Sequence, residues 1–513
     1  MRRKTMFVIA VMFGIISLLR VPCKAEVTTD LFGSPLTLMG YVQQSVGYGI
    51  GGDHYDTKKD LQSFLFQSLL EAKYAPHQDL KFFMSGKLNA DWAYPVFDSN
   101  SEWQSKGFNQ GRDNLYIFDD GRDLLGEAHV TWTPGKEYFR IGKQIVGWGQ
   151  TDGFKLMDQI NPVDQRRGLG DVQFESSIIP MWLVNAEHNT TVNSSWLQEL
   201  GFQVVFNPNL EFRGNERIEP GNEKYGIWAA NIQTPLGGPY PFDYAHIGSW
   251  ADHNNIPDGT FDRNGMEIGV RVRSVINDAI VTLNGFYGRD NDIVRRVIGP
   301  PTSEVSPFDD RLIFHLPTEA DYPILRFVGT TFSRDFPSLS SSALGGVAPT
   351  WRAEAMYVGG FTNGSSLQTF ETSDEIRWMV GMDWKIKIDF LNPKAYFFIS
   401  PQFYQRHIVD YAKSIPDVDY TLTDYSGTIQ QDNYTASLLI STSYFHNKLQ
   451  PMFFWLRDFT GNGSLIKTQI SWEQDYHWKY TLGALFVQGA DPGVNFEPLQ
   501  NKDQVYLTVQ YRF

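Results

Sequence analysis

The chain has 513 residues and a net charge of −14, and aromatic side chains make up 15% of it although its mean hydropathy is only −0.31. Beyond the N-terminus, no stretch approaches the roughly 18 consecutive apolar residues of a membrane-spanning helix, so a helical membrane protein is excluded. No basic face points to nucleic acid as a partner. Two classes fit the composition, a β-rich exported enzyme and a membrane β-barrel.

The first 25 residues have the features of a secretory signal peptide. A basic start, Arg2 to Lys4, precedes a short apolar run, and Cys23 and Ala25 are small residues suited to cleavage after Ala25. We therefore predict export by the Sec route and a mature domain of residues 26–513. Cys23 is the only cysteine of the chain, so the mature protein is expected to have neither a disulfide nor a thiolate metal site.

From residue 36 onward, apolar and polar residues alternate in many short segments. In 80–92, Phe82 and Met84 share one face of the expected strand while Lys81 and Ser85 share the other, because successive side chains point to opposite faces. A membrane barrel needs this pattern, with lipid outside and a polar lumen inside. We predict an all-β fold, a transmembrane antiparallel β-barrel of about 18 strands, with about 16 as the alternative count. The expected strands are 36–47, 62–74, 80–92, 124–133, 138–148, 180–187, 198–206, 266–276, 279–288, 323–333, 350–358, 376–386, 394–406, 434–444, 450–457, 465–473, 478–488 and 504–513.

The links between these segments are short and long in turn. The links 134–136 and 277–278 are turn-type sequences, whereas 93–123 and 207–265 are long. Outer-membrane barrels have short periplasmic turns and long extracellular loops, so we place the protein in the outer membrane, in contact with lipid and lipopolysaccharide. The last strand ends in Phe513 and resembles the signal that barrel assembly machinery recognises, which makes this machinery an expected transient partner.

Aromatic residues give a second indication of a bilayer. Several lie on apolar faces near the ends of expected strands, which is where interfacial girdles belong. Ordinary core packing is the alternative for any one of them, but it explains the whole set less well. These residues are Trp92, Trp132, Trp378, Trp384, Trp472, Trp478 and Tyr511.

The other face of each strand is expected to line a lumen, and there basic side chains modestly outnumber acidic ones. Rings of charge set the selectivity of pores, so this lining favours anionic or zwitterionic solutes. The alternative is a set of structural ion pairs across a wet interior. A ring of about 18 strands is too wide for side chains alone to fill. The candidates for pore-lining or constriction residues are Lys81, Lys87, Arg140, Gln144, Asp158, Asn161, Asp164, Arg166, Arg167, Arg271, Arg273, Arg352, Glu354 and Arg377.

The link 149–179 is the candidate constriction. It is long, carries charges of both signs, and contains the turn-forming pair Asn161-Pro162. Folded inward, it would place Asp158 and Asp164 opposite lumen arginines and create a transverse field that orients dipolar solutes. The alternative is a surface loop that packs on the rim of the barrel.

Three stretches carry a resemblance to a known family. Residues 140–144 (RIGKQ), 147–149 (GWG) and 158–164 (DQINPVD) together resemble the signature of a proteobacterial outer-membrane family catalogued as domain of unknown function 1302, loosely related to alginate-export barrels. A later stretch, 457–461 (RDFTG), resembles its short loop near the C-terminus. The resemblance implies a porin-like barrel over most of 36–513. The residues after Asp164 depart from the pattern, because they lack the expected Pro-Gly stretch.

These features favour a porin-like channel for the diffusion of small polar or anionic solutes. The alternative is a barrel that sheathes a multihaem cytochrome or another periplasmic partner for electron transfer or export. The chain has no Cys-x-x-Cys-His site with which to attach c-type haem itself. We predict no enzyme, because neither a Gly-x-Ser-x-Gly nor a His-Glu-x-x-His motif occurs, and we expect no cofactor. Asp252, Asp258 and Asp262 offer oxygen ligands for Ca²⁺, although a solvated loop is the plainer interpretation.

Overall fold

The computed structural model of the chain describes residues 26–51, 61–91, 121–151, 156–164, 177–192, 194–216, 246–254, 257–300, 302–305, 312–364, 370–411, 423–424, 427–428, 430–489, 496 and 502–513. The expected signal peptide, 1–25, lies outside these ranges, as do Trp92, Arg166 and Arg167.

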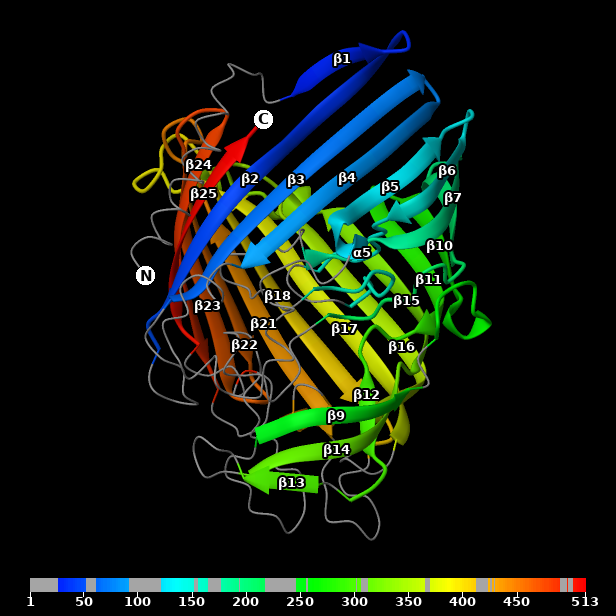
Figure 1. Cartoon of the computed structure of the whole chain (residues 1–513). Helices are drawn as coiled ribbons and strands as arrows, with labels where there is room; N and C mark the ends of the chain where they lie inside the picture. Colours follow the sequence, from blue (N-terminus) through cyan, green and yellow to red (C-terminus); the bar gives the residue numbers. More distant parts are fainter. Residues whose placement is uncertain are drawn as a thin grey trace.

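Most strands of the described residues form one closed antiparallel ring (Figure 1). The main sheet has nineteen strands, and β1 (Val27–Leu31) pairs only with β2, which leaves eighteen strands in the ring. Each of them overlaps one strand expected from the sequence, so the transmembrane barrel and the count of eighteen are confirmed. The ring strands are β2 (Ser34–Gly49), β3 (Leu61–His77), β4 (Leu80–Asp91), β5 (Leu125–Trp132), β6 (Glu137–Gln144), β7 (Met181–Thr191), β8 (Leu197–Asn207), β10 (Glu267–Ile276), β11 (Ala279–Arg289), β15 (Ile324–Asp335), β16 (Thr350–Gly364), β17 (Phe370–Ile386), β18 (Phe397–Ile408), β21 (Asp432–Ser441), β22 (Leu449–Asp458), β23 (Gly463–Glu473), β24 (Trp478–Gln488) and β25 (Gln504–Arg512).

The ring closes where β25 pairs with β2. The Phe513 backbone N–H donates to the Gly40 carbonyl at 3.0 Å, and the Gly40 N–H donates to the Phe513 carbonyl at 2.8 Å. A Cβ at Gly40 would lie 2.3 Å from the Leu69 carbonyl oxygen and 3.0 Å from Cζ of Phe513, so the close approach here requires glycine. The β2–β25 ladder therefore continues to Phe513 and leaves no unpaired edge at the seam.

The two faces of the wall differ as the alternation predicts. Met84 is 58% exposed and Leu283 is 58% exposed, whereas the next residues along their strands, Ser85 and Asn284, are 5% and 1% exposed. Large apolar side chains thus cover the outside, where only lipid can solvate them well, and polar side chains point inward. This arrangement is that of a barrel whose outer face lies in a bilayer.

The long links contain strands that the sequence pattern did not predict. A separate sheet combines β9 (His246–Asn254), β12 (Val294–Val297), β13 (Thr302–Val305) and β14 (Leu312–Asp321), and β9 runs parallel to β14. In Figure 1, β9, β13 and β14 lie at the end of the barrel opposite the β1–β2 hairpin. No helix of the described residues is long and apolar enough to cross a membrane.

Candidate functional site: a segment packed inside the barrel

After β6 the chain leaves the wall. The expected strand ran to Trp148, but β6 ends at Gln144, and the β5–β6 ladder already stops at the pair Ala128–Lys143. Gly142 has a φ of 131°, a conformation that favours glycine and that redirects the strand. Residues 145–151 and 156–164, hereafter the inner segment, continue from this point.

Asn161 fixes the entry and exit of the inner segment. Its side-chain oxygen accepts the Val146 N–H at 2.8 Å, and its amide nitrogen donates to the carbonyls of Gln144 at 3.1 Å and Ile179 at 3.0 Å. Asn161 is 4% exposed. Since one buried amide satisfies three backbone groups at this point, Asn161 holds the turn-back rather than lining a pore.

Apolar side chains of the inner segment form the main buried core. Trp148, Leu156, Met157 and Ile160 are all nearly inaccessible, and Trp148 is 1% exposed. Burying a side chain of this size contributes roughly 1.5–3 kcal/mol. The cluster packs against inward-facing residues of seven ring strands, which are Met181, Leu183, Val205, Phe286, Leu325, Phe327, Met356, Val358, Met379 and Tyr404. The inner segment therefore lies inside the ring, against the arc from β7 to β18.

Two glycines in the wall make room for it. A Cβ at Gly269 would lie 2.5 Å from Cη2 of Trp148, and a Cβ at Gly329 would lie 2.6 Å from Cε of Met157. Both glycines face inward, because their strand neighbours Ile268 and Val328 are exposed on the outer face. The wall and the inner segment are thus complementary in shape at these two contacts.

Charged residues of β16 anchor the backbone of the inner segment. Glu354 accepts the Met157 N–H at 3.1 Å and also accepts the Gln150 N–H. Arg352 donates to the Gln150 carbonyl and is paired with Asp383 at 2.7 Å. Both predicted residues therefore face inward, and both bind the segment that the sequence singled out as the constriction.

Asp158 is used within the inner segment itself. Its carboxylate accepts the N–H groups of Trp148 at 2.5 Å and Gly149 at 2.8 Å. Asp158 therefore closes a tight loop that presents Trp148 to the wall.

A second set of anchors lies in the long links. The Asn291 amide donates to the Gln159 carbonyl at 2.8 Å, and the Asn215 side chain accepts the Val163 N–H at 2.8 Å. Beside Asn291, Asp290 is 7% exposed, just beyond the end of β11. Burial, reinforced by the nearby charge of Asp292, raises the pKa of Asp290 to about 7. The link that binds the inner segment through Asn291 therefore contains a carboxyl group that is protonated more easily than usual.

A buried arginine ties the link after β8 to the start of β5. Arg213 is 7% exposed and pairs with Asp123 at 2.8 Å, Glu216 at 3.0 Å and Glu211 at 3.2 Å. Burial alone would lower the pKa of Arg213, but these three carboxylates raise it above its ordinary value. Arg213 therefore stays charged and holds the segment 211–216 against Asp123, just before β5.

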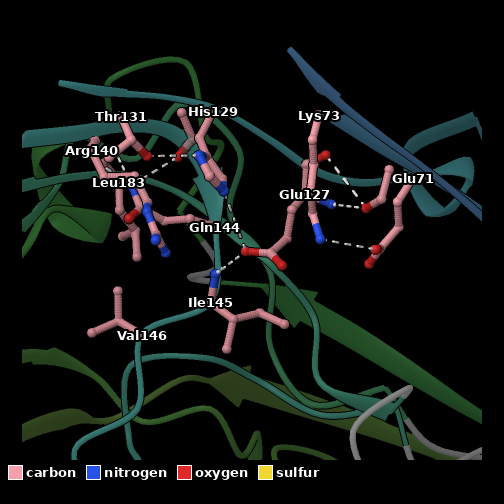
Figure 2. A network of polar contacts seen from close by, with 12 residues as sticks. Glu71, Lys73, Glu127, His129, Thr131, Arg140, Gln144, Ile145, Val146 and Leu183 are labelled. Carbon is pink, nitrogen blue, oxygen red and sulfur yellow. Dashed lines mark hydrogen bonds and ion pairs between the residues drawn. The ribbon is translucent and has the colours of Figure 1, made fainter. Parts of the chain in front are cut away.

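Figure 2 shows the polar contacts where β6 meets the inner segment. The Glu127 carboxylate accepts the Ile145 N–H at 3.1 Å and lies 3.9 Å from the His129 ring. Gln144 is fully buried and donates to the Leu183 carbonyl at 2.9 Å and the Arg140 carbonyl at 3.1 Å. Gln144 thus supports the wall, while Glu127, which was not among the predicted constriction residues, caps the end of the strand.

The inward-facing cations differ in their partners. Arg377 forms an ion pair with Glu375 at 2.7 Å, and Arg406 binds the same carboxylate at 2.6 Å. Arg273 pairs with Glu199 at 3.2 Å. Glu375 and Arg406 were missed, although strand parity relative to Arg377 places Glu375 on the inner face.

The remaining predicted residues lie on the wall or at the end of the inner segment. Lys81 is exposed and Lys87 is half-buried on the inner face of β4, whereas Asp164 lies at the end of the inner segment, where its N–H donates to the Ser177 carbonyl at 2.7 Å. Arg140 packs over the Tyr138 ring, with its guanidinium carbon 5.4 Å from the ring centre.

Neutral amides cover the wall across the barrel seam. Gln510 donates to Gln43 at 3.1 Å, Gln43 donates to Gln67 at 3.0 Å, and Gln67 donates to Asn89 at 3.2 Å. These side chains lie on β25, β2, β3 and β4, and they form one row of hydrogen bonds. The interior therefore has a neutral polar arc beside the charged arc that carries the inner segment.

The residues considered for calcium do not form one loop. Asp252 lies within β9, and Asp262 caps a short helical turn by accepting the Asn264 N–H at 3.0 Å. Within the described ranges, no three His, Cys, Asp or Glu side chains gather into a group that could hold a metal ion.

The comparison with protein families bears on the inner segment. The family model described as "Protein of unknown function (DUF1302)" matches residues 51–292. The predicted resemblance to DUF1302 is confirmed over this range, and the stretch 457–461 lies outside the match. The DUF1302 match contains the whole inner segment, together with Asn215, Gly269 and Asn291, which anchor or accommodate it. No curated protein sequence matches the chain.

Several solved outer-membrane proteins are similar to this chain in structure. OccAB3 of Acinetobacter baumannii shares 8% identity, with 93% of this chain and 99% of that chain covered, at a TM-score of 0.44. OpdK of Pseudomonas aeruginosa, solved with vanillate, shares 7% identity, with 93% and 98% covered, at a TM-score of 0.45. The outer membrane channel DcaP of Acinetobacter baumannii shares 11% identity, with 94% and 99% covered, at a TM-score of 0.35.

Proposed function

We propose that this protein is an outer-membrane channel for the diffusion of small polar and anionic solutes, narrowed by the inner segment. The observation that carries the proposal is a chain segment with its own apolar core, packed against the arc of the inner wall from β7 to β18. A ring of eighteen strands encloses more space than inward side chains alone can fill. A segment folded inside the ring reduces the cross-section of the lumen.

The same arrangement favours small solutes over a folded partner. The inner segment occupies space along the arc from β7 to β18, and Glu354 and Arg352 hold it there by direct contacts. A sheath around a multihaem cytochrome would need that space. The lumen that is left therefore suits the passage of small molecules better than the insertion of a second protein.

Reconstitution of the mature protein in a planar lipid bilayer tests the proposal. The expected result is discrete conductance steps, with a reversal potential in a salt gradient that indicates a preference for anions. The control is the same preparation unfolded by heat, which should insert no channels. Folded protein, verified by its heat-dependent mobility in SDS gels, that leaves the bilayer silent would contradict the channel function.

A further inference from the structure

The outer face of the wall is hollowed where strands β3 to β7 lie side by side (Figure 1). The hollow has a volume of about 640 Å³, and Tyr74, Phe82, Val130, Ile141 and Val184 contribute to its lining. These five residues are successive partners in the ladders, so they form one row on one face of the sheet. Phe82 lies two residues from the outward-facing Met84, which places the row on the outside of the barrel.

The next row, two residues further along each strand, shows why the surface is concave there. In this row Met84 is followed across the ladders by Ala128, Lys143 and Trp182. Lys143 follows Gly142, where the strand is redirected, and its side chain is 3% exposed and lies 3.9 Å from Glu211. A methyl group and a side chain that does not reach the outer surface therefore stand between Met84 and Trp182, and this leaves the hollow.

The lining of the hollow suits hydrocarbon. Every outward-facing residue that contributes to it is aliphatic or aromatic. The hydroxyl of Tyr74 donates to the Leu31 carbonyl at 3.1 Å and is thus already engaged. Concave, mainly apolar surfaces of a few hundred Å³ are typical of ligand sites. The chemistry of this surface therefore points to an apolar ligand.

The size of the hollow matches one acyl chain. Neighbouring strands lie about 4.8 Å apart, so a hollow that crosses from β3 to β7 is up to about 19 Å long. Half of the hydrocarbon core of a bilayer is about 15 Å thick. Because the strands of a membrane barrel are tilted, a line across them runs obliquely between the membrane plane and its normal. An acyl chain can therefore enter the hollow from its own leaflet.

The surroundings of the hollow select a lipid as the occupant. The hollow is continuous with the outer face that lies in the bilayer. In the adjacent row, towards the turn 134–136, Trp132 stacks on Phe139 with 5.5 Å between ring centres. Exposed aromatic residues of this kind belong at the level of the headgroups. A phospholipid whose headgroup lies beside Trp132 therefore has its acyl chains at the level of the hollow.

We propose that this hollow on the outer face of β3 to β7 binds one acyl chain of a phospholipid, which the barrel retains longer than the lipids around it. The bilayer is as apolar as the wall, so burial of apolar surface gives no preference for the site. The preference comes from van der Waals contacts, because a chain in a concave wall has more neighbouring atoms than a chain on a convex one. The site faces away from the lumen, so the inference does not rest on the proposed channel function.

Native mass spectrometry of the delipidated mature protein tests the site. The folded protein in detergent is titrated with palmitoyl-oleoyl phosphatidylethanolamine, and the fraction of barrels that carry one lipid is measured. Saturable binding of one lipid is expected. Dihexanoyl phosphatidylethanolamine has the same headgroup with short chains and should bind at least several-fold more weakly. Equal binding of the two lipids, or binding without saturation, would overturn the acyl-chain site.

A128F fills the hollow, because the new ring projects from the outer face between Met84 and Trp182. It should lower lipid occupancy at least several-fold. A72F is a second variant, since Ala72 also contributes to the lining and is the partner of Met84 on β3. If A128F does not fold, as judged by its heat-dependent mobility in SDS gels, A72F decides the question. Wild-type occupancy in the folded filling variants would refute the proposal.

A186F is the matched control, because Ala186 lies on the same outer face of β7 but outside the lining of the hollow. Its lipid occupancy should equal that of the wild type. A ligand that binds only the folded state stabilises it, so the long-chain lipid should raise the midpoint of unfolding of the wild type and A186F, but not of A128F. An equal rise in all three proteins would count against a specific site.

A second copy of the chain is the competing occupant. A128C introduces the only cysteine of the mature protein predicted from the sequence, and a bifunctional maleimide is applied to it in native membranes. Monomers are expected throughout, because a lipid occupies the hollow. Efficient formation of a crosslinked dimer would assign the hollow to a protein interface and overturn the proposal. These readouts do not depend on conductance, so a bilayer without channel activity would contradict the channel function alone.

Discussion

Glu354 on strand β16 accepts a hydrogen bond from the backbone N–H of Met157 at 3.1 Å, across 197 residues of sequence. The same carboxylate accepts the Gln150 N–H, so it holds the inner segment on both sides of residues 152–155. A buried carboxylate with two N–H donors is a strong anchor, since charge-assisted hydrogen bonds are about twice as strong as neutral ones.

Replacing Glu354 by glutamine should loosen the inner segment. The amide oxygen can keep one N–H, but the amide nitrogen is then directed at the other donor, and an unsatisfied buried group costs about 1–3 kcal/mol. We expect E354Q channels to show a higher mean conductance or more frequent fluctuations in single-channel recordings.

E473Q is the matched control, because Glu473 pairs with Arg512 at 3.3 Å on β23, outside the arc from β7 to β18 against which the inner segment packs. Its recordings should resemble those of the wild type. Traces of E354Q that cannot be told apart from those of E473Q would show that this anchor does not set the width of the lumen.

Substitution of Asn161 should loosen the inner segment more than substitution of an exposed polar residue does. In N161D the oxygen that accepts Val146 N–H is preserved, but a carboxylate oxygen then faces the carbonyls of Gln144 and Ile179. We expect the turn-back to open, at a cost of about 1–3 kcal/mol.

A single cysteine at position 157 reports this opening, because the only cysteine of the chain is Cys23 in the predicted signal peptide. M157C should react slowly with a maleimide, since Met157 is inaccessible, and M157C/N161D should react at least several-fold faster. N447D is the control and should leave the rate unchanged, because Asn447 lies in an exposed turn where its side-chain oxygen accepts from Ser443. Slow labelling in the N161D background would mean that Asn161 does not hold the segment.

The strands and their facing could be predicted from the sequence, because alternation is a local property. Arg271 and Arg377 were placed inward by parity alone, and the exposures of their neighbours agree. The parallel pairing of β9 with β14 could not be predicted, because it joins segments 66–67 residues apart in links without a clear alternation. The alternation of apolar and polar residues also does not show where a chain leaves the sheet. For this reason the strand expected from the sequence ran past Gln144 to Trp148.

The site was predicted only in part for a related reason. The sequence singled out Asn161 as a turn residue, but its three partners depend on where 144–146 and 179 come to lie. Gly269 looks like any strand glycine until Trp148 is placed against it.

Gly269 gives a steric test of the inner segment. The new methyl group of G269A would lie 2.5 Å from Trp148, so the indole must move or the wall must deform. Overpacking of this kind costs typically about 1–3 kcal/mol, and we expect both a lower midpoint of unfolding in detergent and an altered conductance.

The control for G269A is G285A, because a Cβ at Gly285 meets only Cγ2 of Val270 at 3.4 Å. G285A should change neither the midpoint nor the conductance appreciably. If G269A also behaves like the wild type, then Trp148 does not occupy the place against β10 in the membrane.

The raised pKa of Asp290 should make the free energy of unfolding depend on pH in a direction unusual for an aspartate. Burial and the charge of Asp292 raise the pKa of Asp290 from 3.8 to about 7 in the folded protein. Between these two pH values the folded state binds more protons than the unfolded state, so the free energy of unfolding decreases as pH rises. The contribution is fully present below about pH 4, is lost as pH passes through about 7, and amounts to about 1–4 kcal/mol at roughly 1.4 kcal/mol per pKa unit.

D290N, which is neutral at every pH, should flatten this part of the profile of unfolding midpoint against pH, and D292N should shift it to lower pH by removing one cause of the raised pKa. A D290N profile that falls between pH 4 and pH 7 as steeply as that of the wild type would show that another group is responsible.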